Sequence, residues 1–142
     1  MKNKKYTLSV LILMVLHLVA ILGINTSFKE ELLSLSSLTL IIVLLLLIIN
    51  QKDTSISFWI SGAIIVSFSI LIEMLGTNTG VIFGEYTYLE NLGYKIWNTP
   101  PIIGLNWWIL IIASSSFFVG SNLPLIAKAA LGALLMVILD LW

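Results

Sequence analysis

Five stretches of the chain are almost free of charge and approach the length of a membrane span. A hydrocarbon core about 30 Å thick requires about 20 apolar residues in a helix. Water is absent there, so each segment must satisfy its own backbone donors, which a helix does. The sequence therefore predicts an all-α fold, a polytopic transmembrane helix bundle that forms a single domain over residues 1–142. We expect its helices at about 6–24, 32–49, 56–75, 105–120 and 124–142.

Composition supports the bilayer as the solvent of this chain. Apolar residues make up 59% and charged residues 10% of the sequence, whereas a soluble domain carries roughly a quarter charged residues. We expect an integral protein of a bacterial or archaeal cytoplasmic membrane. Lys2, Lys4 and Lys5 precede the first apolar stretch, and the positive-inside rule then places the N-terminus in the cytoplasm. A signal peptide is the alternative for this stretch, but its length and the lack of a clear cleavage site favour an uncleaved span.

The segment 76–104 interrupts the apolar pattern. It contains five of the nine glycines, two of the three prolines and three of the four tyrosines. Long loops in compact proteins are uncommon and often functional. The spacing of Gly76, Gly80 and Gly84 would also suit a helix-packing ridge, but the Asn and Thr residues between them favour a loop. We therefore expect an interfacial or re-entrant loop between the third and fourth helices, and we expect function to reside there.

Ionisable residues within apolar spans are candidates for function because their burial is costly. We select three of them as candidates, His17, Glu73 and Asp140. The expected helices that carry Glu73 and Asp140 run in the same direction, so both carboxyls lie at one depth beside the loop, which itself contains Glu85 and Glu90. The plainer alternatives are that both helix-end carboxyls are solvated at the interface and that His17 is a packing residue. The tryptophans, Trp107 included, equally suit an interfacial belt.

Several chemistries are excluded by what the sequence lacks. It contains no cysteine and a single histidine, which removes thiolate chemistry and the histidine clusters of membrane di-iron enzymes. It contains no arginine, the usual bidentate ligand of phosphate, so neither a phosphate clamp nor a nucleic-acid partner is expected. No aspartate-rich magnesium motif or glycine-rich nucleotide loop is present. Carboxylates and aromatic residues around an apolar cavity remain, and this set suits proton chemistry on an apolar molecule without a metal or cofactor.

The segment that begins at Glu73 resembles the signature of the membrane carotenoid biosynthesis protein family, which includes carotenoid hydratases of the bisanhydrobacterioruberin hydratase type. The resemblance rests on a glutamate followed by glycines and then by Phe-Gly-x-Tyr-x-Tyr, and it covers about half of the chain. The matching stretches are Glu73 to Tyr88, Leu92-Gly93-Tyr94-Lys95, Pro100 to Trp107 and the terminal Leu139-Asp140-Leu141-Trp142. Family members usually continue after this aspartate with a Glu-Pro element and further helices, so we expect a chain shortened at its C-terminus, as a truncation, a natural fragment or a short paralogue.

The resemblance implies a hydro-lyase that hydrates a terminal carbon–carbon double bond of an acyclic carotenoid. A carboxylic acid would protonate the alkene, and water would capture the tertiary carbocation. Burial beside apolar surface favours the neutral form that such an acid needs, and a second carboxylate can accept the proton from water. We assign Glu73 and Asp140 as the acid–base pair in either order, with Glu85 as a third catalytic candidate. The expected substrate-binding residues are Phe83, Tyr86, Tyr88, Trp107, Asn106 and Asn78.

A different class of function also fits the sequence. The chain would then be a non-catalytic membrane protein that binds or hands on an isoprenoid, or an accessory subunit of another carotenoid enzyme. Homo-oligomers and complexes with other carotenoid enzymes are the protein partners we expect. A transporter subunit is the weakest interpretation, because no internal repeat or pair of broken helices is visible.

Overall fold

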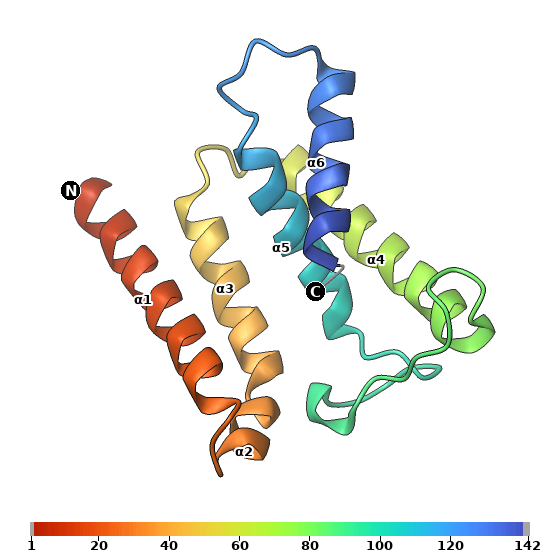
Figure 1. Ribbon diagram of the computed structural model, residues 1–142. Helices are drawn as coiled ribbons and strands as arrows, with labels where there is room; N and C mark the ends of the chain where they lie inside the picture. Colours follow the sequence, from red (N-terminus) through yellow and green to blue (C-terminus); the bar gives the residue numbers. More distant parts are fainter. Residues whose placement is uncertain (1, 141–142) are drawn as a thin grey trace.

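The computed structural model describes the backbone of residues 2–140 and the side chains of residues 4–139. Within this part of the chain all regular elements are helical, as the sequence predicts, and the only strand-like feature is an isolated bridge between Ile96 and Thr99. Figure 1 shows their arrangement. The elements are α1 (Lys2–Gly23), α2 (Lys29–Ser34), α3 (Ser36–Asn50), α4 (Ile56–Thr79), the short 3-10 turn η1 (Glu90–Leu92), α5 (Ile102–Ser116) and α6 (Leu125–Asp140).

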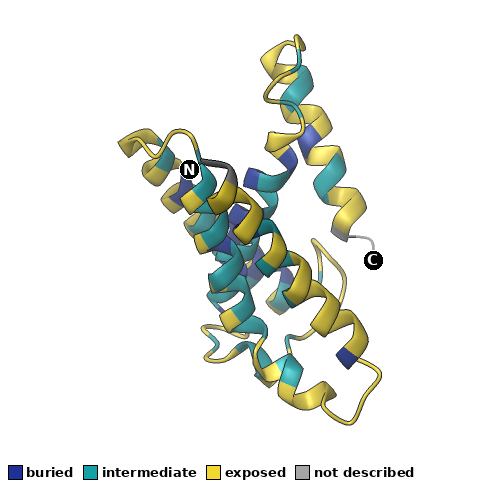
Figure 2. Ribbon diagram, turned by 90° about the vertical axis from the view of Figure 1, so that its left-hand side faces the viewer, coloured by how far each residue is buried: buried dark blue, intermediate teal, exposed yellow. Residues whose placement is uncertain are grey.

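Two helices are long and apolar enough to cross a membrane, Lys4–Gly23 in α1 and Ile56–Thr79 in α4. In the apolar 18-residue stretch of each helix, only 6% and 22% of the residues are buried inside the protein, so neither resembles the core helix of a soluble domain. Figure 2 shows exposed residues along the outer faces of the helices and buried residues gathered between them. Apolar faces turned outward are typical of a protein surrounded by lipid. The apolar helices α3, α5 and α6 are shorter, and the count of five spans stays a prediction.

Helix α5 lies at the centre of the fold and packs against α3, α4 and α6. The buried core consists of Leu44 from α3 together with Trp108, Ile109 and Ile112 from α5. Glycine permits the closest approach of α4 to α5, because a Cβ on Gly62 would lie 2.3 Å from the Trp108 ring. Helix α1 packs along α3 on the side away from α4 (Figure 1).

Helix α4 continues four residues beyond the expected end at residue 75, so the expectation of a loop at residues 76–79 was wrong. The side chains of Thr77, Asn78 and Thr79 bond to the carbonyls four residues earlier, at distances of 2.8, 2.7 and 2.6 Å. These polar side chains therefore bond along the helix rather than compete with it. Gly80 ends α4 in the left-handed conformation, with φ +65°, which glycine adopts without strain.

Smaller differences affect two other helices. The second apolar stretch is divided at Leu35 into the short α2 and the longer α3. Helix α5 begins at Ile102, directly after Pro101, and ends at Ser116. Proline is favoured at helix starts because its fixed φ suits the first turn, which explains the early beginning.

The segment 80–101 is tied to the helices at several points although it is mostly irregular. Ser37 of α3 donates to the Leu92 carbonyl at 3.0 Å, and the Thr77 and Thr99 hydroxyls are 2.9 Å apart. Thr99 and Pro100 are fully buried. In Figure 1 this segment crosses the end of the bundle where α4 ends and α5 begins. Its backbone is thereby anchored, and its placement at a membrane interface stays a prediction.

Candidate active site around a buried carboxyl group

Glu73, near the end of α4, is the one acidic residue among the described side chains that is buried, with 5% of its surface exposed. Its carboxyl group accepts three hydrogen bonds. The hydroxyls of Tyr86 and Tyr88 donate to Oε2 at 2.5 and 2.7 Å, and the Trp107 indole N–H donates to Oε1 at 2.9 Å. Burying a carboxyl without such partners is costly. The sequence placed all four of these residues among its candidates, and the structure brings them into direct contact.

Glycines allow the aromatic segment to fold back onto α4. A Cβ on Gly76 would lie 2.6 Å from the Phe83 ring and 3.6 Å from the Tyr86 hydroxyl. Gly84 has φ +80°, a left-handed conformation that side chains rarely tolerate. The Phe83 and Tyr86 rings then pack edge to face, as do the Tyr86 and Tyr88 rings, with centroids 6.3 and 5.4 Å apart. Packed rings of this kind hold both hydroxyls in place.

Tyr88 remains a neutral donor in this site. Burial raises the pKa of the Tyr88 hydroxyl well above its ordinary value, and its hydrogen bond to Glu73 raises the pKa further. The Lys95 ammonium holds the Tyr88 backbone, donating to its carbonyl at 2.8 Å and to the Glu90 carboxylate at 2.6 Å. Lys95 was not among the site residues predicted from the sequence, although it is the one lysine in the segment 76–104. A single positive charge in a segment with two acidic residues was the available signal.

A largely apolar cavity of about 450 Å³ lies beside Glu73. Five of the predicted site residues line this cavity, and they come from α4, the segment 80–101 and α5. Residues of α6 complete its wall. The lining residues are Glu73, Phe83, Tyr88, Asn106 and Trp107, with Ile103, Leu110, Ala133, Met136 and Val137. A smaller cavity of about 210 Å³ adjoins it and contains Glu73, Phe83, Tyr86 and Tyr88. Apolar walls with a few convergent polar groups are typical of sites for small ligands.

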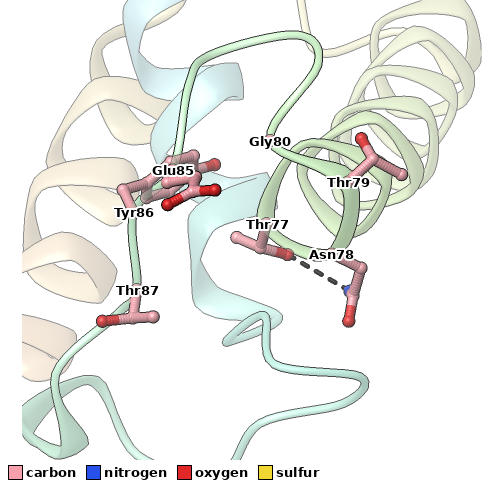
Figure 3. Close-up of a pocket in the computed structure, with 7 residues that line it drawn as sticks. All are labelled: Thr77, Asn78, Thr79, Gly80, Glu85, Tyr86 and Thr87. Atoms are coloured by element: carbon pink, nitrogen blue, oxygen red, sulfur yellow. Dashed lines mark hydrogen bonds between the residues drawn. The ribbon is translucent and has the colours of Figure 1, made fainter.

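The candidates Glu85 and Asn78 lie in a neighbouring polar pocket of about 440 Å³ (Figure 3). This pocket is formed by the end of α4 and the stretch from Glu85 to Thr87 that faces it. Glu85 is exposed. The Asn78 amide donates to the Trp97 carbonyl at 2.8 Å, so it anchors the segment. Tyr86 lines this pocket and also contacts Glu73, which makes it the residue between the polar pocket and the buried carboxyl.

The remaining acidic and basic candidates are placed as follows. Asp140 is the last residue of α6, and its side chain lies outside the described residues. His17 is exposed on α1, and its Nδ1 lies 2.8 Å from the Leu13 carbonyl of the same helix. Among the described residues no group of three His, Cys, Asp or Glu side chains could hold a metal ion.

Fold and site together define an α-helical protein of membrane type with a buried, hydrogen-bonded carboxyl group in the wall of an apolar cavity. The family model described as carotenoid biosynthesis protein matches residues 29–142, and the chain belongs to this family. The match includes every residue of the site. No curated protein and no solved structure matches the chain. The family confirms the resemblance found in the sequence and supports a role in carotenoid biosynthesis.

Proposed function

We propose that this protein is a membrane enzyme that adds water across a terminal carbon–carbon double bond of an acyclic carotenoid. The observation that carries the proposal is the Glu73 carboxyl, held by Tyr86, Tyr88 and Trp107 at the wall of an apolar cavity. The family supports the substrate class. The bilayer would supply the substrate, and the N-terminus would face the cytoplasm.

The first step is proton transfer from a neutral Glu73 to the less substituted carbon of the alkene. The π electron pair forms the new C–H bond, and a tertiary carbocation remains. The carboxylate left on Glu73 then accepts hydrogen bonds at both oxygens from donors already in place. Such preorganised donors stabilise charge as it develops in the transition state, which is how oxyanion holes act. The site is therefore complementary to the charged state of Glu73 that protonation of the alkene produces.

Aromatic rings line the same cavity and suit the cation. Phe83, Tyr88 and Trp107 all contribute to its wall. The faces of aromatic rings attract cations through their quadrupoles. The carboxylate of Glu73 and these rings would thus surround the carbocation while the apolar walls exclude excess water.

In the second step the oxygen of a water molecule attacks the cation and forms the C–O bond. The polar pocket that contains Thr77, Glu85 and Thr87 is the proposed source of water, because Tyr86 connects it to Glu73. The surplus proton returns to Glu73, directly or by way of Asp140, the proposed second carboxyl on α6. The sum is alkene plus water to tertiary alcohol, and no cofactor is consumed.

Pigment analysis in a host that accumulates an acyclic carotenoid tests this function. The wild-type chain should yield a product heavier by one water, and Glu73→Gln should abolish it while the protein still inserts. Glu30→Gln is the matched control, because Glu30 is an exposed acid on α2, and it should leave the product level unchanged. Pigment that binds to the purified wild-type protein without conversion would overturn the hydratase and favour a protein that hands on isoprenoids.

A further inference from the structure

The cavity beside Glu73 has a second polar group in its wall, the amide of Asn106. Tyr88 and Trp107 also line the cavity, but both donate to the Glu73 carboxyl. The other lining residues that the structure describes are apolar. Asn106 is partly exposed, so its amide is accessible from the cavity. The cavity therefore presents two polar centres, the Glu73 carboxyl with its donors and the Asn106 amide.

The helix period explains how Asn106 comes to lie in this wall. The lining residues from α5 share one face of that helix, because they follow one another at three, four and seven residues from the first. They are Ile103, Asn106, Trp107 and Leu110. The lining residues from α6 are all apolar. Asn106 is thus a polar group in an otherwise apolar part of the wall, next in sequence to the tryptophan that donates to Glu73.

An amide in an apolar wall can hold a water molecule. Water occupies a cavity where it finds polar partners, and the Asn106 amide offers a carbonyl acceptor and an NH2 donor. When the carbonyl accepts one O–H bond of the water, a lone pair on the water oxygen remains available for a carbon atom. Because the amide has no acidic proton near neutral pH, it does not compete with Glu73 as the acid.

We propose that Asn106 binds the water molecule that captures the carbocation formed beside Glu73. The proposal rests on the proposed function and assigns its second step to a residue. The water oxygen forms the C–O bond, and the surplus proton passes to the Glu73 carboxylate. Water already held in place reacts faster than water that must first enter the cavity. Without bound water, the cation returns a proton to the same carboxylate and becomes an alkene again.

The fate of the cation can be measured in D2O with the purified full chain in detergent and an acyclic carotenoid. Glu73 exchanges its proton with the solvent and transfers a deuteron to the alkene. Capture by water then gives a deuterated alcohol, and loss of a proton gives a deuterated alkene. Mass spectrometry of the pigments measures the ratio of the two. Asn106→Leu should lower the ratio of alcohol to deuterated alkene about 2- to 10-fold, the effect of one net hydrogen bond.

The sum of alcohol and deuterated alkene is the internal control for folding. It should stay close to the wild-type value in Asn106→Leu, because this variant retains Glu73 and its donors. Asn25→Leu is the matched control variant, since Asn25 is exposed between α1 and α2 and lines none of the cavities described above. It should keep the wild-type ratio.

The two proposals fail in different samples. An unchanged ratio in Asn106→Leu, whether or not the sum falls, overturns the role of Asn106 and leaves the hydratase, because a purely structural role would lower both products together. A wild-type chain that forms no alcohol refutes the hydratase and the role of Asn106 with it.

Discussion

Replacing Tyr88 by phenylalanine removes one of the three donors to Glu73 and leaves the ring in the cavity wall. The lost bond is the 2.7 Å contact from the Tyr88 hydroxyl to Oε2. A hydrogen bond to a charged group contributes about 1.5–3 kcal/mol. If Glu73 carries its full charge only after the proton has left, this energy is lost mainly from the transition state. At about 1.4 kcal/mol for each factor of ten, we expect the rate to fall about 10- to 150-fold.

The assay is the initial rate of water addition to an acyclic carotenoid by the purified protein, with the products separated by chromatography. Because the phenylalanine ring of the variant would still line the cavity, KM should change little while kcat falls. Tyr94→Phe is the matched control, since Tyr94 lies in the same segment and is 80% exposed. Its rate should equal that of the wild type.

A double-mutant cycle with Glu73→Gln makes the test stricter. Because Glu73→Gln should abolish the product, the cycle is measured on thermal stability. If Tyr88 acts through Glu73, Tyr88→Phe should lower the thermal midpoint of the wild type by more than it lowers that of Glu73→Gln, because residues in one network are not additive. The reasoning is refuted if Tyr88→Phe stays within about twofold of the wild-type rate, or if Tyr94→Phe loses as much.

Three further predictions concern the surroundings of the site. The raised pKa of Tyr88 means that this hydroxyl stays protonated above pH 10.0, its ordinary pKa, so its contribution to stability is complete below that pH and declines above it. In an alkaline titration followed by difference absorbance, the wild type and Tyr88→Phe should show the same phenolate absorbance near pH 10.0, because Tyr88 is still protonated there. Gly62→Ala should lower the thermal midpoint by about 4 °C or more, because its Cβ would overlap the Trp108 ring and overpacking costs about 1–3 kcal/mol. Gly120→Ala is the control and should leave the thermal midpoint unchanged, because a Cβ there would meet nothing within 4 Å. Lys95→Met should slow hydration about 2- to 10-fold by releasing the Tyr88 carbonyl, with Tyr94→Phe again as the unaffected comparison.

The helical class and the approximate positions of the helices were predictable, because an apolar run of membrane length allows few other structures. The end of α4 was not. Thr77, Asn78 and Thr79 are typical loop residues, yet their side chains bond to carbonyls of the helix. Only the surrounding structure decides whether such residues end a helix or continue it, since Asn78 also donates to the Trp97 carbonyl from a helical position.

The candidate site was predictable in its centre and less so at its edges. Glu73 was identifiable as an acid within an apolar stretch, and Tyr86, Tyr88 and Trp107 through the family motif. Which donor faces which carboxyl oxygen depends on how the segment 80–101 folds, and no spacing in the sequence specifies this.

The glycines between Glu73 and the tyrosines explain how one motif serves both fold and site. At the sequence level Gly76, Gly80 and Gly84 fit either a helical ridge or a loop, and the structure uses each differently. Gly76 lies inside α4 and leaves room for the Phe83 ring, Gly80 ends the helix, and Gly84 turns the chain at φ +80°. A side chain at the first position would displace Phe83, and side chains at the other two would strain the backbone. The four-residue spacing therefore returns an aromatic segment to the carboxyl of Glu73, which lies roughly two turns before the end of α4, and the donors of Glu73 depend on all three glycines.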